Sequence, residues 1–296
     1  MKTKKYKCGV ILLTGFPNAG KSTLLNSILK NKISIVSHKV QTTKEKISGV
    51  LNVNNSQLIF TDTPGIIEKR KYKTKIFSRS IQDEEKKVDI NLFIYDLSKT
   101  IDKRLLNEIN STIQYFKNNY LILNKIDLVS KDKILECSKF LNSRINFSKT
   151  FMVSAKKGQG CKDLIDFLQT TIPVSPFLYN KDQLTDLSER VFSSEITREK
   201  LFNYLNSELP YNLYVETVIW KETKKSITIH QNINVSKYNH KRIIIGKNGE
   251  NLKKIGISSR KDLEKFFNKK VNLFLFIKIK NNWMNNIKEL NHLGQN

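Results

Sequence analysis

Cysteine, proline and long apolar runs are all scarce in this 296-residue chain. Its three cysteines, Cys8, Cys137 and Cys161, are too few and too scattered for a disulfide framework or a zinc site, which indicates a reducing compartment. The longest apolar runs, such as Leu273–Ile277, fall far short of the roughly 18 residues that span a bilayer. Glycine and proline interrupt the apolar stretch after the basic N-terminus, and no small-residue cleavage site follows it. We therefore expect no transmembrane helix, no export signal and a cytoplasmic protein.

Acidic side chains are the other shortage. The chain has 27 Asp and Glu against 52 Lys and Arg, a net charge of +25, which favours a polyanionic partner. A codon bias toward lysine and asparagine is a competing explanation for the total. The distribution is more informative, because residues 237–280 hold 13 basic and 3 acidic side chains, whereas residues 176–236 hold 7 and 8. The positive charge of the C-terminal part is therefore concentrated in one segment.

The length favours two domains, since single hydrophobic cores rarely grow past about 250 residues. With 39% hydrophobic and 27% charged residues, the composition is that of a soluble globular protein. Up to Thr171, short apolar runs alternate with longer amphipathic stretches, which predicts an α/β domain with a mostly parallel sheet. The expected strands are Gly9–Thr14, Lys46–Val53, Leu58–Asp62, Ile90–Asp96, Tyr120–Asn124 and Thr150–Ser154, and the expected helices are 21–30, 74–87, 102–118, 131–144 and 161–172.

A change of pattern follows at Pro173 and Pro176, because proline cannot continue a helix. We expect a first domain at 1–173, a linker at 174–186 and a second, smaller α+β domain at 187–296. In the second domain the pattern predicts the order helix, strand, strand, helix, helix, strand. Its expected parts are a helix at Leu187–Leu205, strands at Asn212–Trp220 and Ser226–Val235, an amphipathic stretch to Phe267 and a strand at Val271–Lys280.

A phosphate-binding motif lies where the first strand meets the first helix. The segment Gly15–Ser22 reads Gly-Phe-Pro-Asn-Ala-Gly-Lys-Ser and fits GxxxxGK[ST]. Glycines let the backbone wrap a phosphate, Lys21 reaches the β- and γ-phosphate oxygens, and Ser22 offers a hydroxyl to Mg²⁺. The residues expected to contact the nucleotide here are Gly15, Phe16, Pro17, Asn18, Ala19, Gly20, Lys21, Ser22 and Thr23. A glycine turn without a ligand is the competing interpretation.

Three further motifs follow in order, each at the end of an expected strand. The first is Asp62, Thr63, Pro64 and Gly65, in which the Asp62 carboxylate is expected to hold Mg²⁺ through water and the Gly65 amide to approach the γ-phosphate. The second, Asn124, Lys125, Ile126 and Asp127, selects guanine because the Asp127 carboxylate accepts protons that adenine does not present. The third, Ser154, Ala155 and Lys156, offers backbone amides to the guanine oxygen. Each alone could be an ordinary loop, but together they predict a GTPase.

The expected switch loop lies between Ser22 and Asp62. It contains Gln41, Thr42 and Thr43, and we expect a threonine hydroxyl, with preference for Thr43, to reach Mg²⁺ when the γ-phosphate is present. The expected metal ligands are therefore Ser22, Thr43 and Asp62, and the expected catalytic residues are Lys21, Thr42, Thr43 and Gly65. Position 66 is Ile66, so the glutamine that orients water in Ras-like enzymes is missing and intrinsic hydrolysis should be slow.

These motifs together resemble the Era group of bacterial GTPases. The resemblance extends through Ser194–Leu201 and Glu208–Tyr211 to the Ile-Gly-x-x-Gly segment, which covers nearly the whole chain. It implies a P-loop GTPase domain followed by a type II KH domain that binds the 3′ end of 16S ribosomal RNA during maturation of the small (30S) subunit. It also implies GTP, GDP and Mg²⁺ as ligands, a monomer, and peripheral association with the inner face of the cell membrane. Asn18 matches an asparagine that helps to hold K⁺ in related potassium-stimulated GTPases.

A second motif, Gly246–Gly249, lies between two expected helices, as the GxxG loop of a KH domain does. That loop clamps the backbone of about four nucleotides. A plain helix-to-helix turn is the competing interpretation, and the neighbouring Ile-Ile-Ile and positive charge oppose it. The expected RNA-binding residues are Lys241, Arg242, Gly246, Lys247, Asn248, Gly249, Lys253 and Lys254.

Two alternatives remain open at this point. One is a different Era-group GTPase that acts in ribosome assembly or RNA modification. The other is an RNA-binding protein whose nucleotide domain does not hydrolyse GTP.

Overall fold

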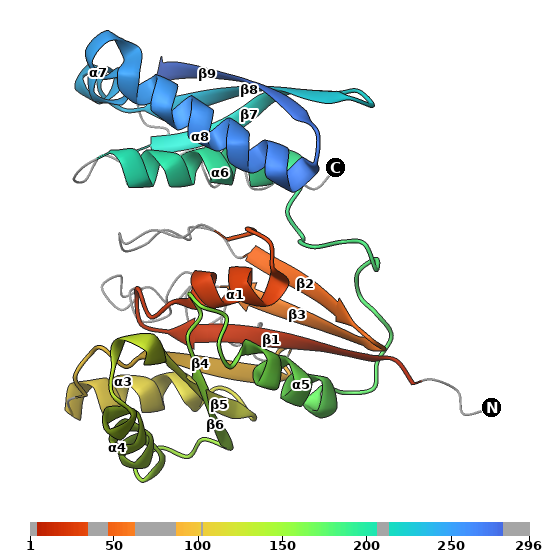
Figure 1. Ribbon diagram of the computed structural model, residues 1–296, viewed down its shortest axis with the longest axis vertical. Helices are drawn as coiled ribbons and strands as arrows, with labels where there is room; N and C mark the ends of the chain where they lie inside the picture. The colour runs from red at the N-terminus through yellow and green to blue at the C-terminus, as the bar shows by residue number, and fades with distance from the viewer. Residues whose placement is uncertain (1–4, 35–46, 63–86, 102, 206–212, 281–296) are drawn as a thin grey trace. The chain divides into compact units, whose positions relative to one another are not determined.

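A computed structural model describes residues 5–34, 47–62, 87–101, 103–205 and 213–280. The chain divides into two compact units, Met1–Asp186 and Leu187–Asn296 (Figure 1). The expected helix at 74–87 lies almost entirely outside the described residues. Within them, no helix is both long and apolar enough to cross a bilayer.

The first unit is built on a six-stranded sheet in the order β2-β3-β1-β4-β5-β6. All neighbouring strands are parallel except β2, which pairs antiparallel with β3 at the edge. β3 and β4 are buried along their whole length, which explains why the sequence shows continuous apolar runs rather than alternation there. The strands are β1 (Lys7–Gly15), β2 (Ile47–Val53), β3 (Ser56–Asp62), β4 (Ile90–Asp96), β5 (Asn119–Asn124) and β6 (Lys149–Val153).

Helices cover the two faces of this sheet (Figure 1). They are α1 (Lys21–Leu29), α3 (Lys103–Ile113), α4 (Lys131–Asn142) and α5 (Cys161–Thr171). α3 ends earlier than the expected 102–118 because the side-chain amide of Asn119 donates hydrogen bonds to the carbonyls of Ile113 (3.1 Å) and Phe116 (2.7 Å). These bonds satisfy carbonyls at the helix end and direct the chain into β5.

Residues 174–186, the expected linker, run along the edge of the first unit. The backbone amides of Leu178 and Tyr179 both donate to the side-chain oxygen of Gln57, at 2.8 and 2.9 Å. Farther along, the amide of Val50 in β2 donates to the carbonyl of Leu184 at 2.9 Å. The segment is therefore fastened to β2 and β3, and the two units divide after Asp186.

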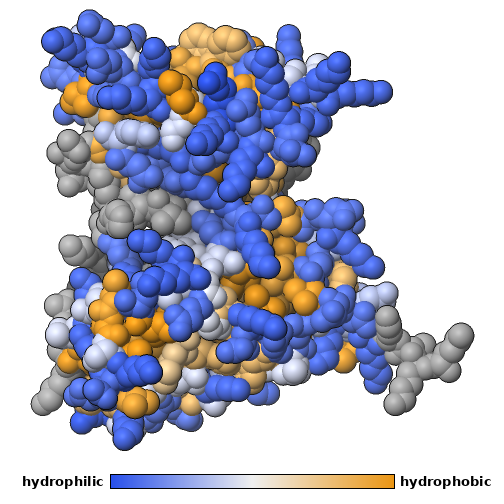
Figure 2. Space-filling view, viewed as in Figure 1, coloured by the Kyte–Doolittle hydropathy of each residue, from blue (hydrophilic) through white to orange (hydrophobic). Residues whose placement is uncertain are grey.

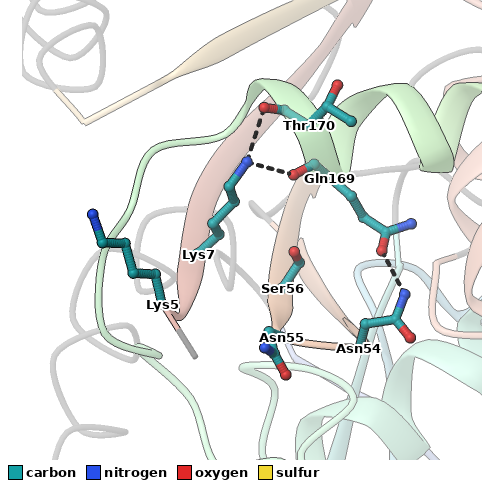
Figure 3. Close-up of a pocket in the computed structure, with 7 residues that line it drawn as sticks. All are labelled: Lys5, Lys7, Asn54, Asn55, Ser56, Gln169 and Thr170. Atoms are coloured by element: carbon teal, nitrogen blue, oxygen red, sulfur yellow. Dashed lines mark hydrogen bonds between the residues drawn. The ribbon is translucent and has the colours of Figure 1, made fainter. Parts of the chain in front are cut away.

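A polar cavity of about 700 Å³ lies near the start of β1 and the end of α5 (Figure 3). The Lys7 ammonium donates to the carbonyls of Gln169 (3.2 Å) and Thr170 (3.0 Å), a favourable place for a cation because it is the negative end of the α5 dipole. The Asn54 amide donates to the Gln169 side chain at 3.0 Å. No lining residue belongs to the phosphate or guanine motifs, so this cavity is separate from the chemistry that they predict.

The second unit has the expected order helix, strand, strand, helix, helix, strand. Its elements are α6 (Glu189–Tyr204), β7 (Leu213–Glu222), β8 (Ser226–Val235), α7 (Tyr238–Ile245), α8 (Glu250–Phe267) and β9 (Lys270–Ile279). The sheet order is β7-β8-β9, with β7 antiparallel and β9 parallel to β8. Buried apolar side chains such as Leu201, Ile233 and Ile255 join α6 and α8 to this sheet and form the core. The unit is thus a small sheet covered by helices, an α+β domain.

Candidate nucleotide site and RNA loop

The phosphate motif forms the turn between β1 and α1. Gly15 and Gly20 have φ of 136° and 99°, and a Cβ added there would lie 2.3 Å from the Ile94 carbonyl oxygen and 2.2 Å from the Asn124 amide nitrogen. Only glycine fits these two positions. The Lys21 side chain is buried and its ammonium donates to the carbonyls of Gly15 (3.1 Å) and Phe16 (3.0 Å). A positive charge thus lies inside a loop at a helix N-terminus, which suits a phosphate.

Asp62 ends β3 beside the phosphate loop. Oδ2 of its carboxylate accepts hydrogen bonds from the hydroxyls of Ser22 (2.6 Å) and Ser34 (2.9 Å). The other oxygen, Oδ1, is buried and has no hydrogen-bond partner among the described residues. Complete burial raises the pKa of Asp62, while the Lys21 charge and the two hydroxyls act in the opposite direction.

A buried carboxylate oxygen without a partner, next to a serine hydroxyl, fits a hydrated Mg²⁺, which prefers oxygen ligands and keeps several waters. The structure thus brings together Ser22 and Asp62, two of the three expected metal ligands. No group of three or more His, Cys, Asp or Glu side chains with metal-site geometry occurs among the described residues.

The two guanine motifs meet each other and the phosphate loop. The Asn124 side chain donates to the Ala19 carbonyl at 2.8 Å and accepts from the Ala155 amide at 3.0 Å. It therefore connects its own loop to the phosphate loop and to the 154–156 loop. The Asp127 carboxylate accepts from the Ser154 hydroxyl at 2.7 Å. This hydrogen bond, opposed slightly by burial, lowers the pKa of Asp127 and keeps it ionised as an acceptor. The arrangement suits a purine edge with two adjacent N–H groups.

Three residues near the site were not expected from the sequence. Asp96 ends β4 and accepts from the Lys125 ammonium at 2.6 Å; although burial opposes it, hydrogen bonds from Lys125 and Ser98 lower the pKa of Asp96. An aspartate at the end of a strand, the same feature that identified Asp62, is the signal that could have found it. Ser34 and Asn26, which holds it, belong to no motif.

Six expected site residues lie outside the described part of the chain, so no geometry is assigned to them. They are Thr42, Thr43, Thr63, Pro64, Gly65 and Ile66. The remaining expected nucleotide residues lie at the carboxyl ends of β1, β3, β5 and β6, either in the last strand residue or in the loop or helix start that follows: Gly15 to Thr23, Asp62, 124–127 and 154–156. This is the edge of a parallel sheet at which ligands bind.

The Gly246–Gly249 loop joins α7 to α8, as expected. Gly246, Asn248 and Gly249 have positive φ values of 73°, 51° and 78°, and a Cβ added at Gly249 would meet nothing within 4 Å. The loop is thus open to a ligand on that side, and it leads directly into the N-terminus of α8. The Asn251 side chain donates to the Ile243 carbonyl at 3.1 Å and fastens the turn.

The basic residues around this loop point to solvent. Arg242, Lys247, Lys253 and Lys254 are exposed and Lys241 is half-buried. Hydrophilic side chains predominate over α7 and α8 in the space-filling view (Figure 2). The Lys254 ammonium lies 4.0 Å from the Glu250 carboxylate. The geometry combines an accessible backbone, a helix N-terminus and exposed cations, which suits a nucleic-acid backbone.

Two family models match the chain. One is described as a 50S ribosome-binding GTPase and matches residues 10–125, and the other is the KH domain and matches residues 208–284.

Curated relatives match nearly the full length. The chain is 39% identical to GTPase Era of Agrobacterium fabrum over 97% of this chain and 91% of that protein. It is 38% identical to GTPase Era of Bradyrhizobium diazoefficiens over 94% and 90%. Among solved structures, an Aquifex aeolicus Era variant bound to GDP and AlF4⁻ is 31% identical, with a TM-score of 0.86 over 97% of this chain and 99% of that one. Era in complex with MgGDPNP and nucleotides 1506–1542 of 16S ribosomal RNA is 30% identical, with a TM-score of 0.84 over 98% and 99%.

Proposed function

This chain belongs to the Era family of GTPases, and from that premise we propose that it is a GTP-dependent switch that binds 16S ribosomal RNA near its 3′ end and assists maturation of the 30S subunit. The protein hydrolyses GTP to GDP and phosphate. One observation carries the RNA part: a relative that matches 98% of this chain was solved with MgGDPNP and nucleotides 1506–1542 of 16S ribosomal RNA.

In this proposal the described residues of the first unit bind and orient the nucleotide. Lys21 faces the β- and γ-phosphates, the amides of the phosphate loop bind their oxygens, and Asp127 accepts from guanine. Asn124 keeps the phosphate and guanine loops at a fixed spacing. Ser22 and Asp62, together with Thr43 from outside the described residues, would hold Mg²⁺, and the metal would neutralise charge on the phosphates.

Hydrolysis is slow in this proposal because Ile66 has no group that orients the attacking water. Asn18 would help to hold a K⁺ ion, as in the potassium-stimulated relatives, and that ion would add positive charge beside the phosphates. Asn18 has a positive φ of 60°, a backbone conformation that residues in functional loops often adopt.

The second unit carries the RNA contact in this proposal. The Gly246–Gly249 loop clamps the sugar-phosphate backbone, and the exposed cations of α7 and α8 neutralise phosphates. The KH model that matches residues 208–284 supports this assignment. We further propose a monomer that acts in the cytoplasm and associates peripherally with the inner face of the membrane, on the basis of the family resemblance.

Crosslinking of the full chain to RNA in cells, followed by sequencing, tests the partner directly. We expect reads concentrated at the 3′ end of 16S ribosomal RNA. Reads concentrated on transfer RNA or on the large-subunit RNA would favour the alternative of another Era-group GTPase. Single-turnover GTP hydrolysis, measured with and without that RNA, tests the other alternative, in which the nucleotide domain has no catalytic role.

A further inference from the structure

Asn26 fastens the backbone that leaves the first helix. Its side-chain amide donates to the Ser34 carbonyl at 2.8 Å, and its oxygen accepts from the amides of Ile33 (2.8 Å) and Ser34 (2.9 Å). Asn26 lies four residues after Ser22 in α1, so both side chains lie on one face of the helix. Three hydrogen bonds to two consecutive residues fix the position of Ser34 more tightly than an ordinary loop contact would.

Ser34 in turn contacts the carboxylate of the proposed magnesium site. The Ser34 side chain is 1% exposed and its hydroxyl donates to Asp62 Oδ2, the oxygen that also accepts from Ser22. Two hydroxyl donors therefore converge on one carboxylate oxygen. Oδ1 is buried and has no hydrogen-bond partner among the described residues, so it is the oxygen that can accept a further hydrogen bond.

We propose that Ser34, held by Asn26, is a positioning residue that fixes the Asp62 carboxylate so that Oδ1 accepts from the water shell of Mg²⁺. The inference rests on the proposed magnesium site. Hydrogen bonds to a metal-binding carboxylate orient it, and their loss typically weakens metal affinity by about 10-fold or more. Ser34 directly precedes the 35–46 segment that contains Thr42 and Thr43, so this contact also links the metal site to the start of the expected switch.

A purely structural role of Ser34 predicts a different result. If Ser34 only satisfied a buried carboxylate, replacing it would lower stability equally with and without Mg²⁺. If it positions Asp62 for the metal, the replacement changes the Mg²⁺ dependence of nucleotide binding while binding without Mg²⁺ stays the same. The two roles are thus separated by the Mg²⁺ concentration rather than by the melting temperature.

The test measures release of a fluorescent GDP analogue from the full chain across a Mg²⁺ titration and in EDTA. For Ser34→Ala and Asn26→Ala we expect the Mg²⁺ concentration at half-maximal retention to rise about 10-fold, with release in EDTA unchanged. Ser34→Thr restores the hydroxyl and should return that concentration close to the wild-type value, whatever its melting temperature. Ser27→Ala is the matched control, because Ser27 lies on the same helix and its hydroxyl contacts Cys161 (3.8 Å) instead of Asp62.

An unchanged Mg²⁺ midpoint in Ser34→Ala would overturn the proposal. The proposal would also be overturned if Ser34→Ala accelerated release of the GDP analogue in EDTA as much as in Mg²⁺. An equal shift of the Mg²⁺ midpoint in Ser27→Ala would overturn it as well. If release from the wild-type protein does not depend on the Mg²⁺ concentration, the proposed magnesium site is wrong, and this inference is wrong with it. RNA binding is measured in parallel, and its failure would count against the proposed RNA partner and leave the Mg²⁺ result intact.

Discussion

The candidate nucleotide site and the candidate RNA loop differ in how their side chains are held. In the first unit Asp62, Asn124 and Ser154 are buried and bonded to other residues of the site. In the second unit Lys247 and Lys253 are exposed, and neither has an ion pair among the described residues. One site is preorganised before the ligand arrives, and the other presents charge to solvent.

This difference sets how each site should respond to substitution. A preorganised polar site discriminates strongly, because a wrong ligand leaves buried groups unpaired. An exposed cationic surface binds through many similar contacts to phosphate, so single losses are graded and depend on salt.

The largest effect should come from Asp127→Asn. The carboxamide cannot accept both guanine protons but can donate to the 2-oxo group of xanthine, so the preference between GTP and xanthosine triphosphate should shift by roughly 10⁴-fold. Competition binding with both nucleotides measures the ratio. Equal losses for both would show that Asp127 does not read the base.

Lys21→Ala should have the next largest effect. Removing the cation that faces the phosphates should lower single-turnover GTP hydrolysis by about 10²–10³-fold. The buried Asp62 carboxylate loses a neighbouring positive charge, so the melting temperature should fall, and turnover is therefore compared at a temperature at which the variant is folded. Lys131→Ala, an exposed lysine at the start of α4, is the matched control and should keep wild-type turnover.

The RNA loop should respond to a change of charge. Lys247→Asp combined with Asn248→Asp places two carboxylates against the phosphates and should weaken RNA binding about 100-fold, with GTP binding unchanged. The charge-matched control is Lys224→Asp with Lys225→Ala in the β7–β8 turn. Because β8 runs ten residues from that turn toward α7, the control lies about 30 Å away along the strand. A loss as large in the control would show that charge alone, and not the loop, sets affinity.

In the fold, the sequence predicts elements that depend on local pattern and misses features that depend on distant contacts. Ile90–Asp96 has the same bounds in the structure as in the prediction, because a short apolar run that ends in a polar residue depends on local pattern. The end of α3 differs from the prediction, because the Asn119 side chain, in the next strand, caps the helix. The path of residues 174–186 along β2 and β3 depends on Gln57, which is far away in the sequence.

In the candidate nucleotide site too, residues fixed by local spacing are predicted, whereas a residue that depends on tertiary contacts is not. The motif residues Lys21, Asn124 and Asp127 are recognisable because their chemistry needs fixed spacing within one segment. Ser34 is not recognisable, because its role depends on Asp62, a residue 28 positions later, and on Asn26. Sequence patterns thus identify the groups proposed to touch the ligand, and tertiary contacts identify the groups proposed to orient them.

A smaller effect should link the two regions. If the switch changes how the second unit is held, protein loaded with a non-hydrolysable GTP analogue should bind RNA more tightly than protein loaded with GDP. The expected coupling is about 1–3 kcal/mol, and RNA must then favour GTP over GDP by the same factor. Titration of one labelled 16S RNA oligomer against both forms measures it. Identical affinities would mean that the two sites work independently.

The smallest expected effect concerns the salt dependence of single lysines. Lys247→Ala should reduce the slope of log affinity against log salt by about 1, because one phosphate contact and its released counterion are lost. Between 50 and 200 mM salt this amounts to only about a three- to fourfold change, so the full titration is needed. Lys131→Ala, on the first unit, should leave the slope unchanged. An unchanged slope in Lys247→Ala would mean that the loop contacts RNA through its backbone alone, and the contrast between a preorganised and a charge-based site would no longer hold at this position.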